Sequence, residues 1–475
     1  MRYSFSAAAL FAATVSADLC SYGSTDDNGN YYCKEVKAIT YTGVGGSASY
    51  NKITSMDGTS GTCSSSPYGY SGSLAPLDEE VSLHFRGPLE LKQLAVYTPG
   101  SSSTKAASYN RARRNAHERR HVAHGHGHAH LHHEREQKRD AALGDLVTAV
   151  IDGKLVSWAN DYSGVATSAP SNAEASKAPS YGNSRIVSTP KAPSYGSASS
   201  SSAAAKASST AKASSSSSSS SDDDDTSGEG WTRTAYYNSA DKSADGLVFL
   251  NHEGGSGSGV FDYTFGNSLS YASADGCSGS SSPQVLEDCT IPSETEVVVM
   301  TDSKCGDDDG CGYYRDGTTA YHGFDGPSKA FFFEFSMPDD GKTAASKYTP
   351  VNMPAIWMLN AQIPRTLQYG NAECSCWTTG CGEFDIFEVL AAGDTRCKST
   401  LHGNKAGGDS DYFARPTNGT IKAALLLYKD NIHIKVLDDS TNFGKTMGDT
   451  FVTEMIADTM ADSMENLVSL FKLSS

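Results

Sequence analysis

The stretch Gly382-Glu383-Phe384-Asp385-Ile386-Phe387-Glu388-Val389-Leu390 decides how this sequence is interpreted, because three acids lie within an otherwise apolar and aromatic run. Alternate side chains of a β-strand share a face, so Glu383 and Asp385 point the same way. Glu388 has the opposite parity, and a one-residue β-bulge near Phe387 would restore it. The stretch therefore predicts a strand that carries three carboxylates in one row.

Three carboxylates in a row are unfavourable unless the acids face water or share protons. Retaining glycoside hydrolysis uses such a set, with a nucleophile and an acid/base whose carboxyl groups are about 5–5.5 Å apart. The alternative is an exposed edge strand with scattered acids. Trp377 and three closely spaced cysteines just before the strand favour a catalytic site over an exposed edge strand.

Length, leader and charge limit the class of protein. The 475 residues exceed one ordinary domain, and residues 1–17 have the charged start, apolar stretch and small-residue end of a secretory signal peptide. The net charge of −17 argues against nucleic acid and anionic membranes as partners. We therefore expect a secreted, monomeric protein that acts outside the cell on a neutral polymer.

Eleven cysteines in a secreted chain predict disulfide bonds. Three lie before residue 100 and eight after residue 270, so one thiol of the first group is either free or paired with the second group. Cys374, Cys376 and Cys381 are too close together to pair only with one another, and Cys397 or Cys277 are candidate distant partners. No paired C-x-x-C spacing supports zinc, and neither a metal nor a cofactor is expected.

Composition divides the chain into six segments. The boundaries are residues 1–17 for the signal peptide, 18–100 for a small Gly/Ser-rich β module, 101–140 for an Arg- and His-rich segment, 141–162 for a β-hairpin, 163–228 for a long Ser/Ala-rich linker expected to be disordered, and 229–475 for a large domain.

The basic segment ends in the dibasic pair Lys138-Arg139. We expect proteolytic processing after Arg139, with a plain charge pair as the alternative. The histidines of this segment could bind metal loosely, but a solvated run is the favoured interpretation.

The large domain is predicted to be all-β. Apolar strand-like runs alternate with Gly, Ser and Asp turns, and only residues 451–471 form a weak helix candidate. This pattern is typical of a β-sandwich with jelly-roll, concanavalin-like architecture. The strand-like runs are 247–250, 296–300, 330–336, 355–359, 383–390, 422–428 and 432–437.

The sequence around the acids resembles that of a known family. Residues 382–388 resemble the E-x-D-x-x-E signature of glycoside hydrolase family 16, the laminarinase-like β-glucanases, and residues 330–338 and 354–359 resemble strands beside that family's site. The whole chain is similar to fungal cell-wall proteins of the Tos type, which join an N-terminal domain, a Ser-rich middle and a family-16-like domain.

This resemblance implies roles for individual residues. Glu383 matches the nucleophile, Asp385 the helper between the acids and Glu388 the general acid/base. His402 matches a histidine that often follows the motif, although a lone histidine is more often structural. A further set of aromatic residues could stack on sugars or simply belong to the core, and these are Trp357, Trp377 and Tyr369.

Two departures from the family put the substrate subsites in doubt. The family usually has a tryptophan five residues before the nucleophile, whereas Trp377 lies six before Glu383. The family's downstream tryptophan strand is replaced by Leu425-Leu426-Leu427-Tyr428.

Three functions compete. The first is a retaining endo-β-1,3-glucanase that acts on wall glucan. The second is a β-glucan transglycosylase, which shares the covalent intermediate and differs only in its acceptor. The third is a non-catalytic wall protein that binds glucan in a groove. It would explain the linker and the aromatics, but not why three acids share one face.

Overall fold

The computed structural model describes residues 23–100, 146–151, 154–159, 230–306, 310–344, 346, 349–460 and 467–473. The predicted signal peptide, the basic segment with its dibasic pair, and the Ser/Ala-rich linker lie outside the described residues.

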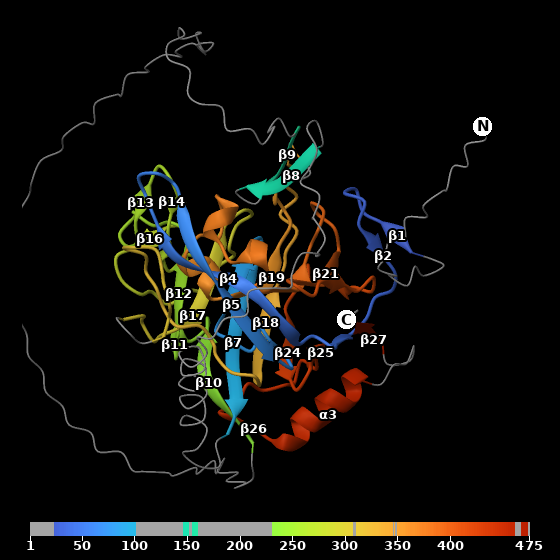
Figure 1. The fold of residues 1–475 in the computed structure, drawn as a ribbon. Helices are drawn as coiled ribbons and strands as arrows, with labels where there is room; N and C mark the ends of the chain where they lie inside the picture. Colours follow the sequence, from blue (N-terminus) through green and yellow to red (C-terminus); the bar gives the residue numbers. More distant parts are fainter. Residues whose placement is uncertain are drawn as a thin grey trace, which may run out of the picture. The chain divides into compact units, whose positions relative to one another are not determined.

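Two large sheets make up most of the described chain (Figure 1). Nearly all neighbouring strands are antiparallel, and β27 and β3 form a parallel pair. The nine-stranded sheet runs in the order β11 (Ser243–Asp245), β10 (Trp231–Asn238), β7 (Glu90–Pro99), β18 (Lys329–Ser336), β24 (Ile421–Tyr428), β25 (Asn431–Leu437), β3 (Ala38–Thr42) and β27 (Val468–Lys472), with β26 (Thr446–Met447) beside β10.

The ten-stranded sheet carries the predicted acidic strand. Its order is β16 (Gly279–Ser280), β15 (Ser270–Ala272), β12 (Leu247–Asn251), β17 (Glu296–Thr301), β6 (Val81–Arg86), β19 (Ala355–Asn360), β20 (Glu383–Glu388), β21 (Arg396–His402) and β22 (Gly407–Gly408), with β23 (Phe413–Ala414) beside β21. All seven strand-like runs predicted in the large domain form strands here or in the other sheet.

The main core lies between the two sheets. Phe333 of β18 meets Phe85 of β6 with ring centroids 6.3 Å apart, and Phe335 meets Phe387 of β20 at 5.2 Å. Leu425 and its neighbours on β24 belong to the same buried cluster. The predicted all-β sandwich is therefore confirmed.

Strands from the N-terminal segment occupy central positions in both sheets. Strand β6 lies between β17 and β19, and β7 lies between β10 and β18. Strand β3 lies between β25 and β27 in the nine-stranded sheet. The prediction of a separate β module in residues 18–100 is therefore wrong. The pairing joins segments roughly 200 residues apart, which local composition does not reveal.

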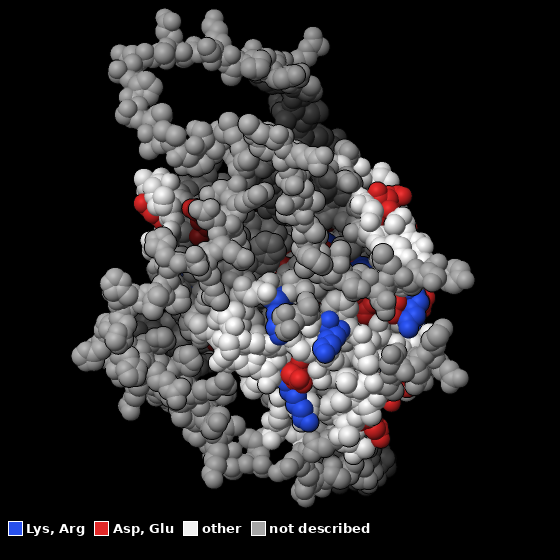
Figure 2. Space-filling view, turned by 45° about the vertical axis from the view of Figure 1, so that its right-hand side comes forward, with Lys and Arg blue, Asp and Glu red and all other residues white. Residues whose placement is uncertain are grey.

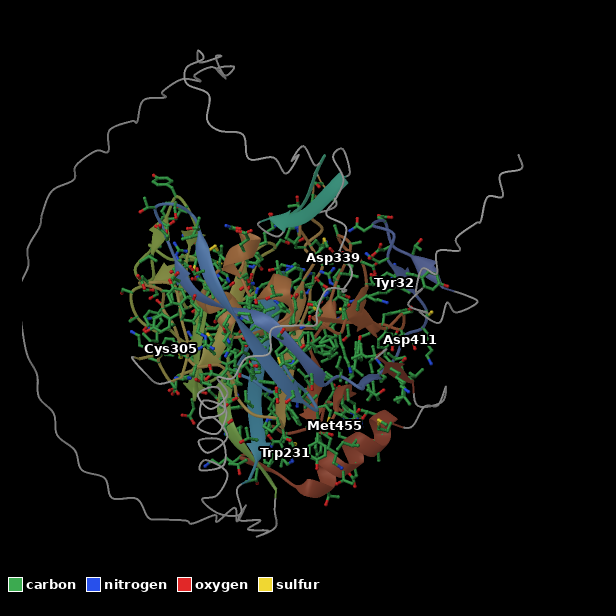
Figure 3. All side chains as sticks on the ribbon, viewed as in Figure 1. Tyr32, Trp231, Cys305, Asp339, Asp411 and Met455 are labelled. Atoms are coloured by element: carbon green, nitrogen blue, oxygen red, sulfur yellow. A yellow bond between two sulfur atoms is a disulfide. The ribbon has the colours of Figure 1, made fainter. Side chains whose placement is uncertain are left out.

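A helix covers the outer face of the nine-stranded sheet. Helix α3 (Asp449–Met460) packs Val452 and Met455 into a second apolar cluster that includes Trp231 of β10 (Figure 3). The helix predicted at 451–471 extends too far, because residues 468–472 form β27 and pair with β3. On the face shown in Figure 2, basic and acidic side chains lie near one another without forming a broad patch of one sign.

Small two-stranded sheets and short helices complete the described chain. The predicted hairpin forms, with Val147 opposite Trp158, whereas its turn residues 152–153 lie outside the described residues. No helix among the described residues is long and apolar enough to span a bilayer. The remaining elements are β1 (Ser24–Thr25), β2 (Tyr31–Tyr32), β4 (Gly46–Met56), β5 (Cys63–Gly72), β8 (Leu146–Ile151), β9 (Lys154–Ala159), β13 (Phe261–Asp262), β14 (Gly266–Asn267), α2 (Gln362–Arg365), η1 (Ala372–Cys374) and η2 (Trp377–Thr379).

Candidate active site

A β-bulge in β20 puts the three acids on one face. Residue 385 pairs with Trp357 of β19 and residue 387 pairs with Ile356, so Ile386 has no partner on that side. Both Ile386 and Phe387 are fully buried in the core. The bulge predicted near Phe387 is therefore confirmed, and the acids lie on the face opposite the core.

Each acid has a different polar partner. The indole Nε1 of Trp377 donates to Glu383 Oε2 at 2.6 Å. His402 of β21 donates through Nε2 to Asp385 Oδ2 at 2.9 Å. The remaining acid, Glu388, lies 3.4 Å from Arg86 Nη2 through its Oε1. The three carboxylates are therefore distinguished chemically, although they share one short strand.

Arg86 reaches Glu388 across a small residue. It lies on β6, two strands away from β20, and both residues stand in register with Ala355 of the intervening strand β19. The methyl side chain of Ala355 leaves room for the guanidinium to pass. Arg86 is also fixed by donating Nε to the carbonyl of Met353 at 2.9 Å.

Burial raises the pKa values of the two glutamates. The pKa of Glu383 is raised to about 8 by burial and then by the charge of Asp385. The same two causes raise the pKa of Glu388 to about 7, against the opposing charge of Arg86. Two neighbouring carboxyls with raised pKa values retain protons near neutral pH, so one can be the acid while the other is ionised.

His402 supplies a positive charge behind the acids. Burial alone would lower its pKa, but the hydrogen bond and charge of Asp385, followed by the charges of both glutamates, raise the pKa to about 9. His402 is therefore an imidazolium at neutral pH and pairs with the Asp385 carboxylate.

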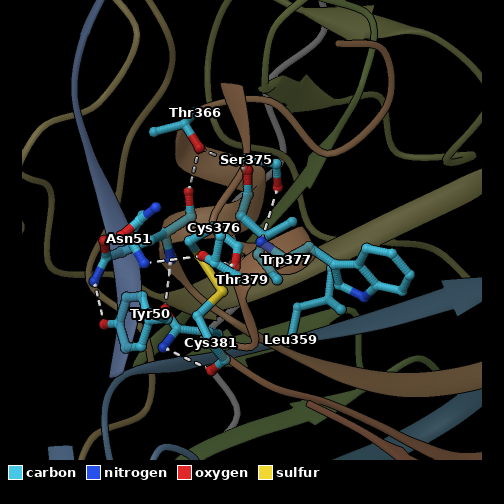
Figure 4. Close-up of a disulfide and its surroundings, with 12 residues drawn as sticks. Tyr50, Asn51, Leu359, Thr366, Ser375, Cys376, Trp377, Thr379 and Cys381 are labelled. Atoms are coloured by element: carbon cyan, nitrogen blue, oxygen red, sulfur yellow. Dashed lines mark hydrogen bonds between the residues drawn. A yellow bond between two sulfur atoms is a disulfide. The ribbon is translucent and has the colours of Figure 1, made fainter. Parts of the chain in front are cut away.

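Trp377 is held in place by a disulfide. Cys376 and Cys381 are bonded to each other, and η2 carries Trp377 inside the loop they close (Figure 4). Gly380 has φ 90°, a left-handed conformation that favours glycine. The Trp377 side chain is 45% exposed, so its ring is open to a ligand while its nitrogen holds Glu383. The extra residue before the nucleophile does not prevent this contact.

A cavity of about 570 Å³ lies beside Arg86, the partner of Glu388, and none of the three acids is among its lining residues. Tyr369 lines this cavity and donates its hydroxyl to Glu296 Oε2 at 2.6 Å. The other oxygen of Glu296 accepts from His84 Nδ1 at 2.7 Å. Although burial opposes it, hydrogen bonds and charge from His252 and His84 hold the pKa of Glu296 well below its usual range. Glu296 is thus an ionised acid in the cavity wall.

Trp357 lies on the floor between the acids and this cavity. Its side chain is only 5% exposed, and the ring of His84 stacks on it with centroids 5.1 Å apart. The guanidinium of Arg86 lies 5.6 Å from the same ring. Its neighbours therefore cover much of the ring that the sequence suggested as a sugar platform, and little of it remains open to a ligand.

The β4–β5 hairpin of the N-terminal segment supports the site from one side. Tyr50 packs into a cluster with Trp357 and both cysteines of the Cys376–Cys381 loop. A second disulfide joins Cys63 of β5 to Cys374. The expectation that one of the clustered cysteines reaches a distant partner is confirmed, but the partner is Cys63. The named candidates were wrong, because Cys277 and Cys397 are free thiols.

Sequence reasoning missed the residues that β6 contributes. His84 and Arg86 alternate with Leu83 and Phe85, so the spacing of their polar side chains on one strand face was visible. They were assigned to a separate module, which hid their relation to the acids. Among the described residues, one group of possible metal ligands occurs, Cys305, Cys311 and His322, but its two cysteines form a disulfide.

Comparison with known proteins identifies the family. The C-terminal model of cell wall protein YJL171C/Tos1 matches residues 229–455, and its N-terminal model matches residues 37–99. A Candida albicans relative named "Probable circularly permuted 1,3-beta-glucanase TOS1" is 43% identical over 459 residues, covering 93% of each chain. The chain belongs to the Tos1 family of cell wall proteins.

Other relatives align over most of both chains. A Saccharomyces cerevisiae protein of the same name is 43% identical, covering 94% of this chain and 95% of its own. An Arthroderma benhamiae protein named "Probable circularly permuted 1,3-beta-glucanase" is 38% identical, covering 95% and 93%. No solved structure matches the chain. The two family models fall on the two segments whose strands share both sheets.

Proposed function

We propose that this Tos1-family protein is a secreted, retaining endo-β-1,3-glucanase of the cell wall. The observation that carries the proposal is the row of Glu383, Asp385 and Glu388 on one face of a bulged strand, which Arg86 connects to a cavity of about 570 Å³. The names of the relatives support β-1,3-glucan as the substrate.

Glu383 acts as the nucleophile. Its carboxylate attacks the anomeric carbon, and the bond from that carbon to the leaving sugar oxygen breaks as Glu388 transfers its proton to that oxygen. A covalent glycosyl ester on Glu383 results. The Trp377 N–H and the charge of His402 oppose the rise in the Glu383 pKa, which burial and the charge of Asp385 still carry to about 8. Because the pKa of Glu388 is raised only to about 7, the attack requires the proton to pass from Glu383 to Glu388 when the sugar binds.

Glu388 then acts as the base. It removes a proton from water, the water oxygen bonds to the anomeric carbon, and the ester to Glu383 breaks with net retention. A sugar hydroxyl in place of water would give transglycosylation by the same chemistry. The charge of Arg86 limits the rise in the Glu388 pKa and so keeps the residue able to exchange its proton in both steps.

The remaining predicted residues bind or position the sugar. Trp377 offers an exposed ring at the acids, and Tyr369 lines the cavity. Trp357 supports the floor, and His402 orients Asp385 rather than contacting the reacting atoms.

The test compares Glu383→Gln and Glu388→Gln with a matched control, Glu334→Gln on β18 of the other sheet. Purified full-length proteins are incubated with laminari-oligosaccharides, and both shorter and longer products are measured. We expect each site variant to lose activity by about 100-fold or more, while Glu334→Gln stays near wild type. Near-normal turnover in either site variant would refute the assignment.

Exogenous azide separates the two roles. With Glu388→Ala, azide can replace water in the second step and should yield a β-glycosyl azide from the retained intermediate. With Glu383→Ala, azide can attack only directly, which gives the α-product. The reverse pattern would mean that the nucleophile and the acid/base have been exchanged. Longer products in the wild-type reaction would identify transglycosylation.

A further inference from the structure

Two aromatic side chains stand exposed on the β13–β14 hairpin. Tyr263 is 98% exposed and Phe261 is 50% exposed. Their ring centroids are 5.3 Å apart with the planes at 77°. Buried aromatics contribute strongly to stability, and exposed aromatic patches commonly mark binding sites. The pair therefore needs an explanation that folding does not supply.

The hairpin that presents these rings is firmly anchored. Asp262 Oδ1 accepts the backbone N–H groups of Thr264 at 2.9 Å and Phe265 at 2.7 Å. Arg315, only 3% exposed, donates Nη2 to Asp262 Oδ2 at 2.6 Å and to the Gly266 carbonyl at 2.7 Å. The backbone on both sides of Tyr263 is thus fixed before any ligand arrives, which reduces the ordering cost of binding.

Two neighbouring structures brace the same hairpin. Phe265 is buried in a cluster with Leu367 and Cys374, beside the Cys63–Cys374 disulfide. Thr264 donates its hydroxyl to the carbonyl of Gly58, between β4 and β5, at 2.7 Å. Figure 1 shows β13 and β14 next to this end of the β4–β5 hairpin. The exposed rings therefore belong to a supported rim.

This rim borders the cavity that Arg86 links to Glu388. Phe265, Gly266 and Asn267 of the same hairpin line the cavity of about 570 Å³, whose lining also includes Arg86 and Tyr369. The cavity thus runs from the contact partner of Glu388 to the strand that follows Tyr263. A polymer lying in the cavity and leaving it at this end would meet the exposed rings.

We propose that Phe261 and Tyr263 form an outer platform that binds a β-glucan chain where it emerges from the cavity. This inference rests on the proposed function and adds a binding site for long substrate. The C–H faces of glucose rings pack against aromatic faces, and Tyr263 can add a hydrogen bond through its hydroxyl. The platform should matter for polymer and not for oligosaccharides short enough to fit within the cavity.

The experiment measures binding in a Glu383→Gln parent, so that turnover does not consume the ligand. Phe261→Ala/Tyr263→Ala is compared with a control at another exposed apolar residue, Leu470→Ala on β27. We expect the double variant to bind insoluble β-1,3-glucan about tenfold more weakly, because both aromatic contacts with the polymer are lost. The double variant should bind laminaribiose as tightly as the parent and unfold at the same temperature. The single variant Tyr263→Phe, which keeps an aromatic ring at that position, should retain most of the parent's affinity for the polymer.

Different outcomes separate the two proposals. Equal polymer binding by the parent and the double variant would overturn the platform and leave the proposed function standing. Failure of the parent to bind any β-glucan, with no turnover by the wild type, would overturn both. If sedimentation shows that the double variant lowers the molecular mass, the rings cover a second copy of the chain and the platform is refuted.

Discussion

A chain that begins at Asp140 is expected not to fold, although it retains all three acids. Deleting residues 18–139 removes β3, β6 and β7, so six strands lose a neighbour, namely β10, β17, β18, β19, β25 and β27. At about 1.5–3 kcal/mol for each large side chain, the apolar burial lost from β6 and β7 comes to about 10–20 kcal/mol. Typical domains are stable by about 5–15 kcal/mol. The side chains counted are exposed by 2% or less, and they are Val81, Leu83, Phe85, Leu91, Leu94, Val96 and Tyr97.

The assay compares this fragment with a matched control, the full chain cut once at a protease site inserted between residues 100 and 146. The cut protein should keep one cooperative thermal transition. Without reductant, its two pieces should stay linked through Cys63–Cys374. The fragment 140–475 should show no such transition. Cooperative unfolding of the fragment, with the denaturant dependence of the full chain, would refute the reasoning. Natural cleavage after Arg139 stays a prediction, and its products should remain associated.

Three further predictions concern the site and its support. Arg86→Met should raise the pKa of Glu388 by about one unit. Because the acid then keeps its proton to higher pH, the alkaline limb of the kcat/KM profile should move to higher pH. An alkaline limb that stays at the same pH would contradict the role of this contact. Cys63→Ser or Cys374→Ser breaks a disulfide between residues 311 apart in sequence and should lower the free energy of unfolding, measured with denaturant, by about 2–5 kcal/mol. The control Cys289→Ser, at a free thiol, should change that free energy by only about 0.5 kcal/mol. The first product released should have the β configuration by proton NMR, and an initial burst of α-anomer would exclude the double displacement.

The local features of the fold could be predicted from the sequence. The side chains of a strand alternate, so the spacing of Glu383 and Asp385 fixes their common face without any knowledge of neighbours. The parity of Glu388 required a bulge, and the structure has it at Ile386. These inferences depend only on residues adjacent in the chain.

The neighbours of each strand could not be predicted. The alternation of polar and apolar residues in β6 predicts a strand with one face exposed to solvent. In the structure, however, Ser82 and His84 are as fully buried as Leu83 between them. Alternation shows which residues share a face, but not what covers that face. Arg86 was therefore missed as the partner of Glu388. The same limit applies to Cys63, because disulfide pairing depends on spatial proximity rather than on spacing in the sequence.

The backbone amide of Gly100 donates to the carbonyl of Gly230 at 2.6 Å, so the chain leaves the sandwich and re-enters it at one point. Strand β27, near the far end of the described chain, lies alongside β3. The order in which a gene encodes the two segments therefore need not determine which strands pair. A rearranged chain that starts at residue 230, continues from residue 473 through a linker to residue 23 and ends at Gly100 would contain the same strands. Residues 101–229 join two backbone positions that are in contact, so a change in the length of this segment need not move any strand of the sandwich or any of the three acids.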